Sequence, residues 1–281
     1  RMWEHNATQR NLNKLYSYGY KFIGPIDGEM ACGEYGKGKM SSPRQIVSHL
    51  EKYFRQKDYL KKKNIKATVT TGPTREYIDP VRYISNESSG KQGYEIAMEL
   101  SRLGIKTTLI IGPTNLNFDK NLSIKKVTSG EEMLRKVQKT LPVDIAVCTV
   151  AVSDFKPIKI SKTKIKKNKI NEIKLEKNTD ILSFLGTNNQ FKPKLLVGFS
   201  AETENLLDNS QKKMENKFCD LMIANDVSKS DYGFNKDYNE VVIIDKYKNK
   251  QKIKRSSKKF IASIIAKRII NTFLINEKKF N

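Results

Sequence analysis

Cysteine and histidine are scarce in this chain, and their spacing excludes several kinds of site. Only Cys32, Cys148 and Cys219 occur among the 281 residues, and no two of them form a C-x-x-C pair. This pattern favours a reducing compartment over a secreted fold held by disulfides. The two histidines, His5 and His49, do not cluster with cysteine, so the sequence offers no zinc site.

Long apolar runs are also missing. No stretch approaches the ~20 apolar residues that cross a bilayer, and the first residues lack the basic-then-apolar order of a signal peptide. We therefore expect a cytoplasmic protein with no membrane partner. The chain starts with Arg1 rather than methionine, from which we expect that the front of a longer protein is missing.

Two glycine motifs for nucleotide binding are absent as well. No strand end carries the dinucleotide motif G-x-G-x-x-G. The stretch "SNESSGKQG" contains Gly90 and Lys91 but fails as a P-loop, because Ser85 replaces the first glycine and Gln92 replaces the hydroxyl that holds magnesium. Gly90 still precedes a predicted helix, whose N-terminal amides suit an anion.

Positive charge is abundant but scattered. Lysine and arginine total 53 against 30 acidic residues, for a net charge of +23. Such charge suits nucleic acid, an acidic membrane or small polyanions. The lysines are spread through predicted helices, loops and both ends, and no motif alternates aromatic with basic residues. We therefore expect small-molecule substrates and no nucleic-acid partner.

The polar stretch "LKKKN", Leu60 to Asn64, separates two unlike regions. Before it, a glycine-dense loop lies between an expected short strand at 21–23 and a helix at 43–56. That region is too small to be a stable domain alone. We place the domain boundary here, with one domain ending at residue 63 and the other covering 64–281.

After this break, strands and helices alternate. Alternation predicts an α/β fold with a Rossmann-like, mostly parallel sheet and helices on both faces. Such sheets bind ligands beyond the carboxyl ends of their strands, and here those ends run into glycine, asparagine, aspartate and hydroxyl residues. The expected strands are 66–71, 106–112, 144–152, 194–200, 220–226 and 239–245, and the expected helices are 93–104, 129–140, 205–217 and 258–273.

An ordered series of motifs carries a family resemblance. The segment "TTGPTREYIDPVRYISNESSGKQG" is followed in order by "AVSDFKP", "KIKK", "KNTDIL", "VGFSAET" and "KFCDLMIANDV". Over nearly all of Ala67 to Val227 the sequence resembles the phosphopantothenate-cysteine ligase domain of bacterial bifunctional coenzyme A biosynthesis proteins. The earlier "MACGEYGKGKM" resembles the active-site flap of phosphopantothenoylcysteine decarboxylase, a flavodoxin-like domain. The resemblance implies that FMN binds mainly to residues that would precede Arg1.

The resemblance also implies a reaction. The carboxylate of 4′-phosphopantothenate attacks the α-phosphate of CTP with Mg²⁺, pyrophosphate leaves, and the amine of cysteine displaces CMP from the acyl-cytidylate. FMN-dependent decarboxylation to 4′-phosphopantetheine would follow in the full-length protein. Ligase domains of this family pair as dimers and decarboxylase domains form trimers, so a homo-oligomer is expected. The alternatives are another nucleotide-dependent α/β ligase or reductase, and a basic nucleic-acid-binding module.

Three residues match the family's catalytic positions. Lys164 would stabilise charge on the phosphates, although a solvated basic loop explains the same lysine run. Asn86 would serve acyl transfer, because an amide donates and accepts without ionising; its alternative is a turn residue. Cys32 would protonate the enethiolate formed by decarboxylation, or be an incidental loop thiol. Arg82 is expected to hold an anionic group of the substrate.

Further positions match the family's nucleotide contacts. Without the resemblance, Phe199 reads as a core residue and the pair Lys213 and Lys217 as one exposed helix face. Asp154 is also a candidate magnesium ligand, with a turn cap as its alternative. The expected nucleotide contacts are Cys148, Thr149, Val150, Asp154, Lys164, Thr179, Asp180, Ile181, Leu182, Phe199, Lys213 and Lys217.

Overall fold

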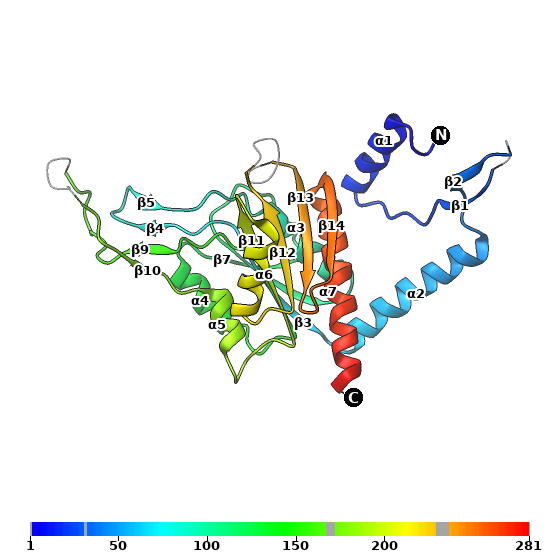
Figure 1. The fold of residues 1–281 in the computed structure, drawn as a ribbon. Coiled ribbons are helices and arrows are strands. Elements are labelled where there is room, and N and C mark those ends of the chain that lie inside the picture. Colours follow the sequence, from blue (N-terminus) through cyan, green and yellow to red (C-terminus); the bar gives the residue numbers. More distant parts are fainter. Residues whose placement is uncertain (1, 31–32, 167–171, 229–235, 281) are drawn as a thin grey trace. The chain divides into compact units, whose positions relative to one another are not determined.

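The computed structural model describes residues 2–30, 33–166, 172–228 and 236–280, which form two compact units, Arg1–Asn64 and Ile65–Asn281 (Figure 1). None of the helices in these described ranges is long and apolar enough to span a membrane.

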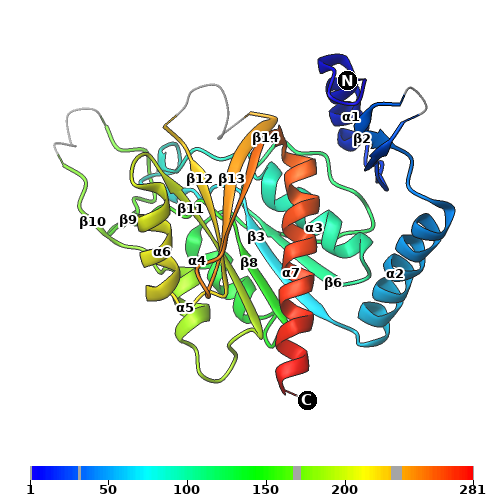
Figure 2. The same ribbon diagram turned by 45° about the vertical axis from the view of Figure 1, so that its right-hand side comes forward.

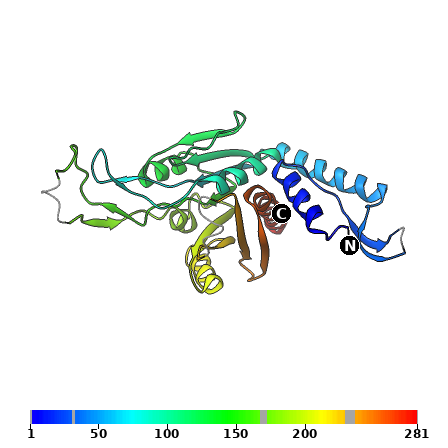
Figure 3. The same cartoon turned by 90° about the horizontal axis from the view of Figure 1, so that it is seen from above.

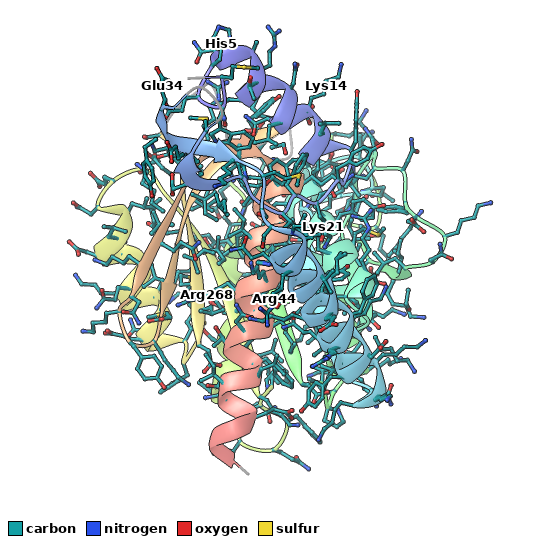
Figure 4. The ribbon with its side chains drawn as sticks, turned by 90° about the vertical axis from the view of Figure 1, so that its right-hand side faces the viewer. His5, Lys14, Lys21, Glu34, Arg44 and Arg268 are labelled. Carbon is teal, nitrogen blue, oxygen red and sulfur yellow. The ribbon has the colours of Figure 1, made fainter. Side chains whose placement is uncertain are left out.

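The first unit contains α1 (Asn6–Ser17), α2 (Pro43–Lys62) and a hairpin of β1 (Ile26–Glu29) and β2 (Tyr35–Lys39). His5, labelled in Figure 4, caps α1 by accepting a hydrogen bond from the backbone of Ala7. The strand expected at 21–23 is wrong: these residues form a loop, and the strand begins at Ile26. Gly24 and Pro25 follow them, and Pro25 has no N–H to give to a ladder.

Helix α2 begins with a capping box. Gln45 N–H donates to Ser42 Oγ at 3.2 Å, and Ser42 N–H donates to Gln45 Oε1 at 2.9 Å. The helix then continues to Lys62, past the residue 56 at which the sequence predicted its end. Charged residues without a helix breaker do not stop a helix, so the polar stretch at 60–64 lies partly inside α2.

The second unit is built on an eight-stranded sheet with the order β14-β13-β12-β11-β8-β3-β6-β7. Six strands of this sheet, β12, β11, β8, β3, β6 and β7, run parallel to one another. At one edge, β13 pairs antiparallel with β12, and β14 pairs antiparallel with β13. The expected mostly parallel α/β sheet is confirmed. The strands are β3 (Lys66–Thr71), β6 (Lys106–Ile111), β7 (Ser123–Lys126), β8 (Ile145–Cys148), β11 (Leu195–Glu202), β12 (Leu221–Asp226), β13 (Tyr238–Asp245) and β14 (Lys250–Ser257).

Helices cover both faces of this sheet. Helices α3 (Lys91–Arg102) and α7 (Lys258–Phe280) pack side by side on one face (Figure 2). Arg268 of α7, labelled in Figure 4, donates to Asp245 at the end of β13 at 2.7 Å. The other face carries an apolar cluster that includes Met133, Ile181, Leu185 and Met214. Its helices are α4 (Gly130–Gln138), α5 (Ile181–Thr187) and α6 (Leu206–Asn216).

Two small hairpins extend beyond the carboxyl ends of the parallel strands. One pairs β4 (Glu76–Tyr77) with β5 (Tyr83–Ile84), and the other pairs β9 (Phe155–Pro157) with β10 (Leu175–Lys177). Figure 3 shows them next to each other, and β4 contacts β9. They leave the sheet directly after β3 and β8, so they belong to the edge at which ligands are expected.

Candidate active site

A cavity of about 600 Å³ lies where the parallel strands end. The last residues of β3 and β8, Thr71 and Cys148, line it together with Ser200 of β11 and Asn225 of β12. The loop 85–90 and the segments 149–154 and 178–182 complete most of its wall. The sequence placed the site at this edge of the sheet, and the cavity is there.

Most of the expected ligase residues meet in this cavity. Arg82 and Lys164 do not line it, and Cys32 lies outside the described residues. The expected residues that do line the cavity are Asn86, Cys148, Thr149, Val150, Asp154, Thr179, Asp180, Ile181, Leu182, Phe199, Lys213 and Lys217.

Asn86 is held across the cavity by a backbone contact. Its Nδ2 donates to the carbonyl of Val152 at 3.0 Å. The loop is anchored further on, where Thr71 Oγ1 donates to the carbonyl of Gly90 at 3.0 Å. Gly90 has φ = +70°, and a Cβ there would lie 3.2 Å from Cα of Gly72, so the turn into α3 requires glycine. The loop therefore sets the Asn86 amide against the segment that follows β8.

An ion pair orders the side of the cavity formed by α5 and α6. Asp180 caps α5 by accepting from the N–H of Ser183 at 2.9 Å, and it also accepts a hydrogen bond from the ammonium of Lys217. Burial opposes ionisation of Asp180, but the hydrogen bonds from Lys217 and Ser183 outweigh it and lower the pKa of the carboxyl. The carboxylate is thus charged and fixed at neutral pH.

Lys213 is a cation without such a partner. Burial first, and then repulsion from Lys217, lowers the pKa of its ammonium, because both disfavour the charged form. Within the described ranges, Lys213 Nζ makes no hydrogen bond. A half-buried ammonium facing a cavity suits an anionic ligand such as a phosphate.

The two cysteines of the second unit are not nucleophiles. Cys148 and Cys219 are both buried in the apolar cluster, and burial raises the pKa of each thiol to about 12. A thiol with such a pKa stays protonated at neutral pH, whereas nucleophilic attack needs the thiolate. Cys148 can therefore contribute to the site only by the packing of its side chain and by its backbone groups.

Lys164 and Arg82 belong to the two hairpins. Asp79 accepts hydrogen bonds from the N–H groups of Val81 at 2.8 Å, Arg82 at 2.9 Å and Ile165 at 3.2 Å. Arg82 also donates to the carbonyl of Ile165 at 3.3 Å. Asp79 thus fastens the segment next to Lys164 to the turn that carries Arg82. In the sequence, the only sign of this role for Asp79 is the turn-forming Asp-Pro pair that it begins, and Asp79 was not predicted.

Other polar residues of the cavity were not predicted, and four of them are Gln92, Asn225, Asn239 and Lys258. Asn225 was visible as a polar residue at the end of an expected strand. Gln92, Asn239 and Lys258 gave no signal, because their approach depends on how α3, β13 and α7 pack. All four line the cavity.

Comparisons with known proteins agree with this architecture. Residues 62–273 match the family model described as the DNA/pantothenate metabolism flavoprotein C-terminal domain, and residues 1–55 match the model described as flavoprotein.

Among curated relatives, the coenzyme A biosynthesis bifunctional protein CoaBC of Haemophilus influenzae is 40% identical over 274 residues, which are 97% of this chain and 67% of that protein. The protein of the same name from Bacillus subtilis is 38% identical over 260 residues, which are 92% of this chain and 64% of that protein. The chain thus spans about two thirds of the length of these relatives.

Solved structures with the same fold include a C-terminal domain of a coenzyme A biosynthesis bifunctional protein CoaBC, with a TM-score of 0.63 and 34% identity, covering 74% of this chain and 95% of that one. A DNA/pantothenate metabolism flavoprotein from Streptococcus pneumoniae has a TM-score of 0.62 and 25% identity, covering 73% of this chain and 98% of that one. With a family model matched over most of its length and a bifunctional relative 40% identical, this chain belongs to the family of coenzyme A biosynthesis bifunctional proteins.

Proposed function

We propose that the second unit joins 4′-phosphopantothenate to cysteine at the expense of CTP. The observation that carries this proposal is one cavity at the ends of the parallel strands. The Asn86 amide, the half-buried ammonium of Lys213 and the Asp180–Lys217 pair all line it. An amide and several cations are the groups that a phosphate-activated acyl transfer needs.

In the first step, a carboxylate oxygen of the acid bonds to the α-phosphorus of CTP while the bond to the pyrophosphate oxygen breaks. Lys213 and Lys217 neutralise the phosphate oxygens from α6. The backbone of Thr179 to Leu182, fixed by the Asp180 cap, reads the edge of the cytosine.

In the second step, the cysteine nitrogen bonds to the acyl carbon, CMP leaves with the bonding electron pair, and the amine gives up a proton. Asn86 Nδ2 donates to the acyl oxygen, on which negative charge develops. For this it exchanges its hydrogen bond with the Val152 carbonyl for one with the intermediate.

Magnesium fits this site with one protein ligand. Within the described ranges, no three acidic, histidine or cysteine side chains form a metal-binding group. Nucleotide enzymes commonly hold Mg²⁺ by one or two carboxylates together with phosphates of the substrate. We assign that carboxylate to Asp154, which lines the cavity. The ion, when bound, offsets the negative charge of the phosphates.

The hairpins would complete the site in an oligomer. Arg82 donates to the carbonyl of Ile165, the residue after Lys164, and neither cation lines the cavity wall. We propose that the ligase unit is a dimer and that its hairpins bring both cations to the substrate. Lys164→Gln then slows pyrophosphate release, and a normal first-step rate in that variant would remove Lys164 from the mechanism.

The first unit is proposed to be the C-terminal part of a decarboxylase domain, up to residue 63, with Cys32 as its proton donor. Its described residues form two helices and a hairpin, a set that does not make a flavin site. Apart from the proposed proton donor Cys32, no residue of this chain is assigned to an FMN-dependent step.

The proposal is tested by incubating the protein with CTP, Mg²⁺, 4′-phosphopantothenate and cysteine, and by measuring pyrophosphate and CMP separately. We expect pyrophosphate without cysteine and CMP only with it. Absence of cysteine-dependent CMP would rule out the ligase.

A further inference from the structure

A second basic group faces the cavity from the opposite face of the sheet. Lys258 is the first residue of α7, is only 5% exposed and lines the cavity. Its backbone N–H donates to the carbonyl of Asp237 at 2.9 Å, and its carbonyl accepts from Gln92 Nε2 at 3.2 Å. Its ammonium hydrogen-bonds to no residue in the described ranges. A buried ammonium without a partner costs free energy unless a ligand pairs with it.

The start of α3 lies beside Lys258. Gly90, Lys91 and Gln92 all line the cavity. Gly90 at the N-cap position has no side chain to cap this helix, and Ser89 Oγ accepts a long hydrogen bond from the N–H of Lys91 at 3.4 Å. The first backbone N–H groups of a helix have no partner inside it, and the helix dipole adds positive potential there. Lys91 is engaged with Asp237 at 2.6 Å, so two ammonium groups stand against one carboxylate.

Unpaired side-chain amides complete the surroundings. The Oδ1 atom of Asn225 and the Oε1 atom of Gln92 are both buried and have no hydrogen-bond partner among the described residues. Asn225 is 9% exposed and lines the same cavity. An amide can turn to present its NH₂ group instead, because the two orientations have nearly the same shape. Asn225 can therefore donate to a bound anion, whereas the Gln92 amide is held in its orientation by the bond from its Nε2 to the carbonyl of Lys258.

We propose that Lys258, the N-terminus of α3 and the Asn225 amide form a subsite for a phosphate-class anion, separate from the Lys213 and Lys217 group on α6. The anion is either the pyrophosphate end of the nucleotide or the terminal phosphate of the acid substrate. This assignment to a substrate rests on the proposed function, whereas anion binding itself does not.

Binding is measured by titration calorimetry on the full chain, with inorganic pyrophosphate and 4′-phosphopantothenate as separate probes and pantothenate as the probe without phosphate. Lys258→Met removes the charge and keeps the length of the side chain. Lys254→Met is the matched control, because Lys254 lies exposed on β14 and is not part of the cavity wall.

Loss of a charge-assisted hydrogen bond in a desolvated site corresponds to about a 10- to 100-fold weaker affinity. We expect Lys258→Met to weaken binding of one of the two phosphate probes by that factor, and Lys254→Met to leave it within about twofold. The probe whose binding is weakened shows which substrate, the nucleotide or 4′-phosphopantothenate, supplies the anion. Wild-type affinity of Lys258→Met for both probes would overturn the subsite.

The unmutated protein provides a second measurement, should the Lys258 variant fail to fold. Burial first, and then repulsion from Lys91 on α3, lowers the pKa of Lys258 to about 8, with Asp237 acting in the opposite direction. Sulfate does not titrate in this range, whereas the charged fraction of Lys258 falls about tenfold between pH 7 and pH 9. Sulfate affinity should therefore fall about five- to tenfold over that range. Constant sulfate affinity would count against the subsite.

These outcomes separate the two proposals. Pyrophosphate binding that depends on Lys258, in a protein that forms no CMP, would retain the subsite and discard the ligase. CMP formation at a normal rate, with unchanged KM values for CTP and 4′-phosphopantothenate in Lys258→Met, would retain the ligase and discard the subsite.

Discussion

Asn86 illustrates how one side chain depends on a contact far along the chain. Its amide donates to the carbonyl of Val152, so it is oriented before any substrate arrives. Asn86→Asp puts a carboxylate beside that carbonyl and removes the donor. We expect pyrophosphate release at a near-normal rate and a fall of about 100-fold in CMP formation, the usual cost of losing one oxyanion donor.

The measurement is a single-turnover assay that follows pyrophosphate and CMP in the same sample. Asn121→Asp is the control, because it makes the same chemical change at an exposed position outside the cavity wall. Unimpaired CMP formation by Asn86→Asp would exclude Asn86 from acyl transfer.

Asp180 contributes both to the stability of the folded state and to the candidate active site. Its hydrogen bonds with Ser183 and Lys217 lower its pKa below the value in the unfolded chain, so its ionised form favours the folded state. The stabilisation is present above the unfolded pKa of ~3.9 and is lost as the pH falls through the lower folded value. Asp180→Ala should cost about 1 kcal/mol at pH 7 through the lost cap, and should raise KM for CTP.

Urea unfolding at pH 7 and at decreasing pH checks this prediction. Asp208→Ala on α6 is the comparison, because Asp208 is also acidic and near a helix start but is exposed and outside the cavity wall. Equal midpoints for the two variants at pH 7 would contradict the role of Asp180.

At the scale of elements, regular hydrophobic patterns in the sequence predicted the central strands and helices well. Loops and element ends were predicted less well. The strand 66–71 is found as expected, because five of its six residues are buried in the centre of the sheet. Strand β8 ends at Cys148 rather than 152, since the chain then turns toward Pro73 and the cavity. Strand β14 escaped prediction because Ile253 is its one buried apolar residue.

Helix α3 approaches the sheet so closely that Gly93 has no room for a side chain. A Cβ at this position would overlap the hydroxyl groups of Thr71 and Thr149. Gly93→Ala must push the start of α3 away from β3 and β8, and we expect it to destabilise the second unit by about 1–3 kcal/mol. It should also weaken nucleotide binding, because the cavity wall moves with the helix.

Thermal unfolding and CTP titration of the variant check both effects. At Gly36 an added Cβ would meet only Met30 Cε at 3.7 Å, so Gly36→Ala is a control in which glycine is lost without overlap. An unchanged melting temperature for Gly93→Ala would show that the contact is not close in solution.

For the whole molecule, the cavity needs helices from both faces of the sheet. Asn86, Asp180 and Lys213 lie in segments with distinctive local sequence patterns, and the motifs along the chain predicted these segments as parts of the site. Lys258 lies in a lysine-rich segment that resembles many others in a chain with 53 basic residues. Only the packing of α7 beside α3 brings it to the cavity, and no local pattern encodes that contact.

The two compact units differ in what each can do alone. The second unit has an eight-stranded sheet with a cavity at its strand ends, whereas the described part of the first unit has two helices and a two-stranded hairpin. We therefore expect the 281-residue chain to form CMP from CTP in the presence of cysteine and to release no carbon dioxide from 4′-phosphopantothenoylcysteine. Flavin absorbance after incubation with FMN and gel filtration reports retention of the cofactor independently of turnover. Carbon dioxide release by this chain would show that its first unit forms a working decarboxylase.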